Sequence, residues 1–181
     1  KEDEDSTSFP LMNRVNLRAA LAALADAMNP EDVFFLYLTS HGEPGVFSTV
    51  FYDVITRDLT ATDLNLALED AGIGNAVVAL SACYSGSFAE SLKAPNRLIL
   101  TAADTDSVSF GCDDKNAWTD WARAFFLEAL AQTHDFREAA RIAQTSVAQQ
   151  EQAEGLPPSA PMILEGDAIG RIIDSRLASL D

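Results

Sequence analysis

Three short apolar segments constrain the fold of this chain more than any other feature of its sequence. Residues 33–38 and 76–80 are apolar throughout, residues 97–101 contain three apolar residues between Arg97 and Thr101, and none of the three segments alternates apolar with polar side chains. Segments of this length and composition are typical of strands that are covered on both faces, as in a parallel sheet. We therefore expect these three segments to form the centre of a largely parallel sheet.

Helical patterns alternate with these strands. Leu17, Leu21, Leu24 and Met28 fall on one face of a helix predicted over residues 15–28, which Pro30 should end. A capping-box pattern at Thr60 predicts the start of a second helix, and Gly72 is placed to stop it. Further helices are expected over residues 118–130, from residue 135 and over 168–180, with small strands near 46–51, 53–57 and 161–164. This alternation predicts an α/β fold with helices on both faces of the sheet.

Composition supports a single globular domain and excludes several functions. The chain has 181 residues, of which 48% are hydrophobic, and its 28 acidic and 12 basic residues give a net charge of −16. Such an acidic surface repels nucleic acids and anionic lipids, so we expect neither as a partner. No apolar segment approaches the ~20 residues that a membrane-spanning helix requires. Residues 1–12 are expected to be a flexible acidic segment or loop remnant, and residues 13–181 the folded domain.

The two cysteines argue against a scaffold built on disulfides or zinc. Cys83 and Cys112 form no CxxC pair, and the two histidines lack the spacing of zinc ligands. A single Cys83–Cys112 bridge remains open at this level. Cys112 is otherwise expected to be a bystander, and His134 a surface residue. Trp118 and Trp121 are expected to pack in the core.

Two of the predicted strands end in residues that carry chemistry. His41 and Gly42 follow the strand at 33–38, and Cys83 follows the strand at 76–80. Ligands bind beyond the carboxyl ends of strands in an open parallel sheet, so both side chains should emerge at one edge. A cysteine nucleophile needs a nearby base, and histidine can accept the thiol proton and later protonate a leaving amine. Each residue alone is more often structural, and only their combination indicates catalysis.

At these segments the chain resembles the legumain-type (asparaginyl endopeptidase) cysteine peptidases, most closely bacterial members. The resemblance is carried by Thr-Ser-His-Gly at 39–42, Ser-Ala-Cys-Tyr-Ser-Gly-Ser-Phe at 81–88 and Thr-Ala-Ala at 101–103, followed by Ser-Phe-Gly-Cys at 109–112. These segments occur in the same order as in the family. The likeness extends from about residue 17 to about residue 173. It implies a caspase-like three-layer α/β/α sandwich.

The resemblance also implies an activity and the residues for it. The chain is expected to be a cysteine endopeptidase, with Cys83 as the nucleophile and His41 as the acid and base. The N–H groups of Gly42 and Cys83 would form the oxyanion hole. Its substrate would be a peptide or protein cleaved after Asn or Asp, and no metal or other cofactor is expected. Two alternatives stay open: a transamidase or peptide ligase that uses the same acyl-enzyme, and a non-catalytic binding module.

Four residues are candidates for the pocket that receives the substrate side chain. The family has an acidic residue two positions before the nucleophile, where this chain has Ser81, and a pocket serine that matches Ser109. A further pocket residue is either Asp120 or Arg123, depending on the alignment. Asp120 would favour Asn, whereas Arg123 would favour an acidic side chain.

The beginning of the chain departs from the family pattern. The family fold starts with a central strand that carries a further residue of the active site, and no segment before Asn13 has the pattern of a buried strand. We therefore expect a missing N-terminal segment of the same protein to act as a partner of this domain. The resemblance suggests a bacterial protein, periplasmic or attached to a membrane through segments outside this sequence. The sequence leaves the oligomeric state open.

Overall fold

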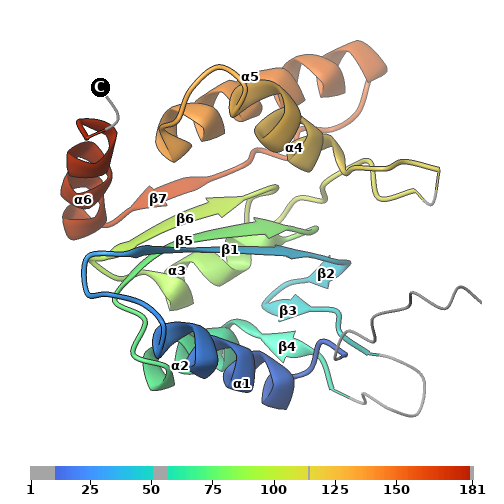
Figure 1. Cartoon of the computed structure of the whole chain (residues 1–181). Helices are drawn as coiled ribbons and strands as arrows, with labels where there is room; N and C mark the ends of the chain where they lie inside the picture. The colour runs from blue at the N-terminus through green and yellow to red at the C-terminus, as the bar shows by residue number, and fades with distance from the viewer. Residues whose placement is uncertain (1–10, 51–56, 114, 180–181) are drawn as a thin grey trace, which may run out of the picture.

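A four-stranded sheet between two layers of helices forms the centre of the protein (Figure 1). The computed structural model describes residues 11–50, 57–113 and 115–179. Helices cover both faces of the sheet, as the alternation of strands and helices predicts. The expected α/β/α sandwich is therefore confirmed.

The sheet is mostly parallel, in the order β1-β5-β6-β7. Its strands are β1 (Val33–Thr39), β5 (Asn75–Ser81), β6 (Arg97–Thr101) and β7 (Ile163–Glu165). The first three run parallel, and β7 pairs with β6 in the antiparallel direction. Thr39 pairs with Ser81, and Leu80 with Thr101, so the three parallel strands end in line. We call the edge where they end the carboxyl edge and the opposite one the amino edge.

The two helical layers pack on separate hydrophobic cores. One layer contains α1 (Arg14–Ala25), α2 (Ala61–Asp70) and α3 (Ala89–Leu92). The other contains α4 (Asp120–Ala122), the π-helical η2 (Arg123–Ala129), α5 (Phe136–Glu154) and α6 (Asp167–Leu177). Val78 and Leu80 of β5 belong to the core of the first layer, whereas Val77 and Ala79 belong to that of the second. This alternation explains why β5 reads as apolar throughout, since each face needs its own apolar side chains.

Local sequence signals set the ends of several helices. Thr60 and Asp63 form the predicted capping box at the start of α2, and Gly72 follows the helix with a φ of +70°. The side chain of Asp135 accepts a hydrogen bond from the backbone of Arg137 at the start of α5. The helix expected over residues 15–28 is shorter, and Leu24 is 48% exposed. Leu24 fits the predicted apolar face but does not pack in the core, which α1 contacts through the buried Leu17 and Leu21 and the half-buried Ala25.

Strand β1 differs from the prediction that it is buried on both faces. Six of its seven residues are half-buried and Thr39 is exposed, whereas β5 is buried from Ala76 onward. The reason is its position, because within the described residues only β5 pairs with it. The partner segment expected from the same protein stays a prediction, and the outer edge of β1 is where an added strand could pair.

A small antiparallel sheet lies beside the end of β1 (Figure 1). It consists of β2 (Gly42–Glu43), β3 (Val46–Phe47) and β4 (Leu59–Thr60). The strand expected near 46–51 is thus shorter, and most of the one expected near 53–57 lies outside the described residues. None of the described helices is long and apolar enough to span a membrane.

Candidate active site

The ends of β1 and β5 bring the segments of His41 and Cys83 together at the carboxyl edge. Thr39 pairs with Ser81 in the sheet, and the next amide, Ser40 N–H, donates to the Ser81 carbonyl at 3.3 Å. The chain beyond β1 therefore continues alongside the chain beyond β5. His41 and Cys83 lie at the same edge of the sheet, as their positions after neighbouring strands predict.

Gly42 lies directly against the backbone of Cys83. A Cβ atom on Gly42 would be 2.3 Å from the carbonyl oxygen of Cys83 and 3.1 Å from the Cβ of Ala82. No residue with a side chain fits at this distance, so the contact requires glycine. It places the main chain next to His41 in contact with the residue that carries the thiol.

The thiol of Cys83 is half-buried and hydrogen-bonded to Ser109. The Ser109 N–H donates to Sγ at 3.4 Å, the thiol donates to the Ser109 carbonyl at 3.5 Å, and Ser109 Oγ lies 3.9 Å from Sγ. His41 is exposed, and no hydrogen bond found among the described residues joins it to Cys83.

The turn after Cys83 is fixed by backbone contacts. Tyr84 has a φ of +55°, which is uncommon for a residue other than glycine, and its N–H donates to the Ser107 carbonyl at 2.8 Å. The buried Ser85 hydroxyl accepts from the N–H groups of Ala102 and Ala103, each at 3.1 Å. A φ value of this kind persists only where surrounding contacts maintain it, and such residues cluster at functional sites.

Three of the four predicted pocket residues belong to segments that contact one another, and one of them, Ser109, contacts the thiol. Ser81 is buried, and its hydroxyl forms a 2.8 Å hydrogen bond with that of Thr119. Asp120 follows Thr119, and its N–H donates to the carbonyl of Phe110 at 3.2 Å, next to Ser109. Ser81, Ser109 and Asp120 therefore belong to segments that contact one another beside Cys83.

Arg123 is directed elsewhere. Its guanidinium group contacts Glu128 and Gln150, and Gln150 belongs to α5. These two partners hold the guanidinium group against η2 and α5. Of the two alternatives for the pocket, the structure thus connects Asp120 to the segment of Ser109 and connects Arg123 to α5.

A hollow of about 370 Å³ lies beside Thr119, the hydrogen-bond partner of Ser81, and none of the four candidate pocket residues lines it. Thr39, Thr119, Cys112, Trp118 and Ala122 are among the residues that line it. Cys112 is exposed and forms no disulfide, which settles the open question of a bridge to Cys83. Trp118 is 43% exposed, so the expectation that it packs in the core is wrong, whereas Trp121 is only 2% exposed.

His134 and the acidic side chains are the remaining candidates for chemistry. His134 is exposed, as predicted. Across residues 11–50, 57–113 and 115–179, no three histidine, cysteine, aspartate or glutamate side chains are grouped to hold a metal ion. The hydroxyl contacts of Ser85 and Thr119 were not predicted from the sequence. Nothing in the sequence pairs them with their partners, although the repeated serines at 81, 85 and 87 are a weak signal.

Comparison with known proteins agrees with this picture. The profile described as the Peptidase C13 family matches residues 19–161. Among solved structures, the chain is similar to caspase-1 from Spodoptera frugiperda, with a TM-score of 0.60 and 14% sequence identity over 88% of this chain and 70% of that one. At this identity the likeness concerns the fold alone. No curated protein sequence matches the chain.

Proposed function

Because the chain belongs to the Peptidase C13 family, the legumain family of cysteine peptidases, we propose that it cleaves peptide bonds through a dyad of Cys83 and His41. The observation that carries this proposal is the contact between Gly42 and the Cys83 carbonyl. That contact joins two residues 41 positions apart in the sequence, at the edge where a parallel sheet binds its ligands.

The reaction uses the thiol and the imidazole in two steps. His41 accepts the proton of Cys83, and the thiolate attacks the carbonyl carbon of the scissile bond. The tetrahedral intermediate collapses as the C–N bond breaks, and His41 transfers its proton to the leaving amine. A water molecule, deprotonated by His41, then hydrolyses the thioester, and the proton returns to the thiol.

Backbone amides are suited to stabilise the charge that develops on the substrate oxygen. The N–H groups of Gly42 and Cys83 belong to two segments in direct contact, and neither group requires a side chain to be positioned. Each donor of an oxyanion hole contributes roughly 10²–10³-fold to turnover in enzymes of this chemistry. The half-buried position of Cys83 leaves its sulfur accessible to an extended peptide.

The pocket residues favour Asn over Asp before the scissile bond at neutral pH. Asp120 lies beside the segment of Ser109, while Arg123 is occupied by Glu128 and Gln150. A carboxylate accepts a hydrogen bond from the amide of an Asn side chain and repels the carboxylate of Asp. Ser109 can donate to or accept from either side chain, so the discrimination falls to Asp120.

A peptide with an electrophilic group in place of the scissile bond tests the activity. We expect a peptide carrying Asn and a reactive ketone to modify Cys83 and to leave the exposed Cys112 unmodified, as read by mass spectrometry of tryptic fragments. His41→Ala should slow this labelling, because no base then activates the thiol. Equal labelling of both cysteines would contradict the dyad.

Specificity is tested with peptides that differ only at the residue before the cleaved bond. We expect Asn to be preferred to Asp at pH 7, and Asp120→Asn to reduce that preference. Arg123→Gln is the matched control, because its side chain points to α5, and it should leave the preference unchanged. A preference for Lys or for a large apolar residue would contradict this assignment of the pocket.

A further inference from the structure

The hairpin of β2 and β3 begins directly after His41, so its position decides where the imidazole lies. Glu43 pairs with Val46, and Pro44 and Gly45 form the turn between them. Gly45 has a φ of +73°, which suits a tight turn that has proline before glycine. In such a two-residue turn, the N–H of the second residue is not part of the strand pairing and is free to bind another group.

The hydroxyl of Ser87 binds that N–H. Gly45 N–H donates to Ser87 Oγ at 2.8 Å, and Ser87 Oγ donates to the carbonyl of Tyr84 at 2.5 Å. Tyr84 immediately follows Cys83, and Ser87 belongs to η1 (Ser85–Phe88). A single half-buried hydroxyl therefore connects the tip of the hairpin that follows His41 to the turn that follows Cys83.

The neighbouring residue provides an apolar contact between the same two segments. Phe88, also in η1, packs edge-to-face against Phe47 of β3 with ring centroids 6.3 Å apart, and both rings are buried. This contact presses the hairpin against η1 but allows it to pivot about the ring edges. The directional hydrogen bond from Gly45 N–H to Ser87 opposes such a movement at the tip, in addition to the pairing of β3 with β4.

We propose that Ser87 is a positioning residue that sets the orientation of His41 relative to Cys83. The inference rests on the proposed function. The hairpin is held at its base by the contact of Gly42 with Cys83 and at its tip by Ser87. With both ends fixed, the segment that carries His41 cannot tilt away from the thiol. Without the hydroxyl, the tip keeps one longer hydrogen bond, from Ala61 N–H to the Gly45 carbonyl at 3.4 Å, and the hairpin keeps its pairing with β4 and the Phe47–Phe88 contact.

The loss of such a contact is expected to act on turnover more than on substrate binding. Misplacement of a catalytic group by about 1 Å can reduce the rate by roughly 100-fold. We expect Ser87→Ala to lower kcat by about tenfold to 100-fold with little change in KM, because the hydroxyl is occupied by backbone groups and not by substrate. Ser87→Thr keeps the hydroxyl and should recover most of the rate.

The experiment uses Cys112→Ser as the parent, so that only one thiol reacts. The rate of alkylation by iodoacetamide is measured from pH 5 to pH 9, together with kcat and KM for an Asn-containing peptide. A thiol paired with imidazole reacts well below its ordinary pKa of about 8.5. Ser87→Ala should shift the alkylation profile toward that of an ordinary thiol, and Ser87→Thr should shift it back.

Thr101→Val is the matched control for general loosening of the structure. Thr101 Oγ1 also accepts one backbone N–H, from Met162, and donates to one carbonyl, that of Ala103. The variant should lose thermal stability and keep the parent's alkylation profile. Equal profiles in Ser87→Ala and the parent, or equal shifts in Ser87→Ala and Thr101→Val, would overturn the positioning role.

A measurement on the hydrogen bond itself does not depend on activity. Amide hydrogen exchange of Gly45, followed by NMR, should accelerate at least tenfold in Ser87→Ala and stay unchanged in Thr101→Val. Unchanged exchange in Ser87→Ala would refute the proposal even where the parent is active. A parent that neither cleaves peptide nor reacts faster than an ordinary thiol would instead refute the dyad, and the role of Ser87 with it.

Discussion

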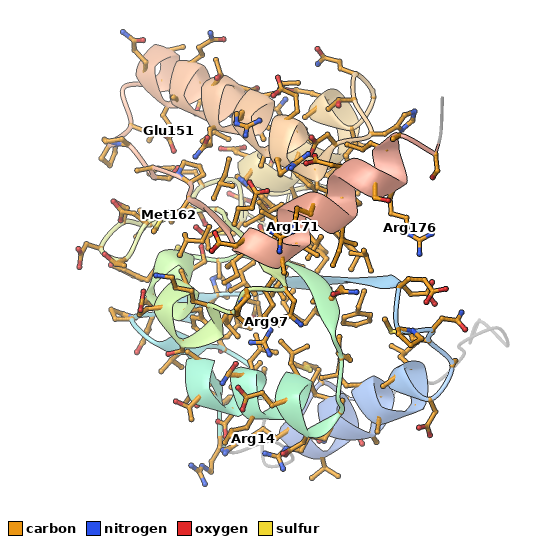
Figure 2. All side chains as sticks on the ribbon, turned by 90° about the vertical axis from the view of Figure 1, so that its left-hand side faces the viewer. Arg14, Arg97, Glu151, Met162, Arg171 and Arg176 are labelled. Carbon is orange, nitrogen blue, oxygen red and sulfur yellow. The ribbon has the colours of Figure 1, made fainter. Side chains whose placement is uncertain are left out.

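The two edges of the sheet are held together by different kinds of interaction. At the carboxyl edge, the links around Cys83 are hydrogen bonds of hydroxyl and backbone groups, such as those of Ser81, Ser85 and Ser87. At the amino edge, the links include guanidinium groups. Figure 2 looks onto that edge, where Arg97 reaches from β6 toward α2 and donates to Asn65 at 2.5 Å.

The strongest ionic link is centred on Arg137. Its side chain is 13% exposed and contacts Asp135 at 2.7 Å, Asp174 at 2.5 Å and Glu165 at 3.1 Å. These contacts join the start of α5 to the end of β7 and to α6. Hydrogen bonds to Asp135 raise the pKa of Arg137 further, so it stays charged at every pH of interest.

The segments around Cys83 are thus linked by uncharged groups, and the charged side chain proposed for the pocket, that of Asp120, is not one of these links. The proposed reaction changes the charge of a thiol and an imidazole, and a nearby fixed charge would shift both equilibria. Neutral hydrogen bonds hold the Cys83 turn in place without such an effect. The ionic cluster at Arg137 lies at the amino edge, and there it can link helices without affecting the thiol at the carboxyl edge.

The largest expected effect separates activity from stability at the carboxyl edge. Cys83→Ala should lower peptide cleavage by about 10³-fold or more, because no nucleophile remains. Its urea midpoint should stay close to that of the wild type, because alanine is small and the backbone contacts of the turn are kept. Cleavage and urea unfolding are measured on the same preparation. Wild-type cleavage by this variant would remove Cys83 from the mechanism.

The second prediction reverses this pattern at the amino edge. Arg137→Met should lower the free energy of unfolding by about 2 kcal/mol, because three carboxylates lose a partly buried partner. Peptide cleavage at 25 °C should be retained. Arg141→Met is the control, since its exposed pair with Glu138 should contribute less than about 0.5 kcal/mol. The free energies are measured by urea unfolding. An equal loss of unfolding free energy in Arg137→Met and Arg141→Met would contradict the stabilising role of the cluster.

The third prediction concerns how the contribution of Arg137 to stability changes at acidic pH. Burial raises the pKa of Asp135, but hydrogen bonds from Arg137 outweigh it and hold that pKa below the usual 3.8. A depressed pKa contributes stability above the unfolded value, and this contribution is lost as the pH falls through the folded pKa. The difference in unfolding free energy between wild type and Arg137→Met should therefore be constant above about pH 5 and shrink below about pH 4.

Urea titrations of both proteins between pH 2.5 and pH 7 measure this difference. A gap that stays the same size throughout would mean that the cluster acts through packing of the arginine and not through its charge. A gap that widens in acid would contradict the sign of the linkage.

The smallest expected effect sharpens the contrast between the two cysteines. Cys112 is exposed and unbonded, whereas Cys83 is half-buried against Ser109. Cys112→Ala should change the free energy of unfolding by less than about 0.5 kcal/mol and leave peptide cleavage unchanged. A marked loss of cleavage would assign Cys112 a part in substrate binding through the hollow that it borders.

Much of the fold was predictable, because its signals are local. The strand predicted over 97–101 coincides with β6, and the capping box at Thr60 starts α2. The predictions failed where the burial of a residue depends on its position in the fold and not on the local sequence pattern. Leu24 fits an apolar helical stripe but extends past the core, and β1 is apolar like β5 but lies at the edge of the described sheet.

The candidate site was predictable in part for the same reason. His41 and Cys83 could be placed at one edge, because strand ends in a parallel sheet share an edge whatever the details of packing. The choice between Asp120 and Arg123 could not be made, because they are three residues apart on one helical segment. Only the partners of Arg123 on η2 and α5 separate them.

The sequence by itself determined the class of fold, the edge at which chemistry could occur and the two residues proposed to carry it. All three follow from the order of apolar strands and amphipathic helices, and from the residue types that follow the strands, His41 and Cys83. The tertiary structure decided that Gly42 touches Cys83, that Ser87 binds Gly45 and that Asp120 lies beside the Ser109 segment. These contacts join residues with no fixed spacing in the sequence, and their geometry exists only once the layers have packed.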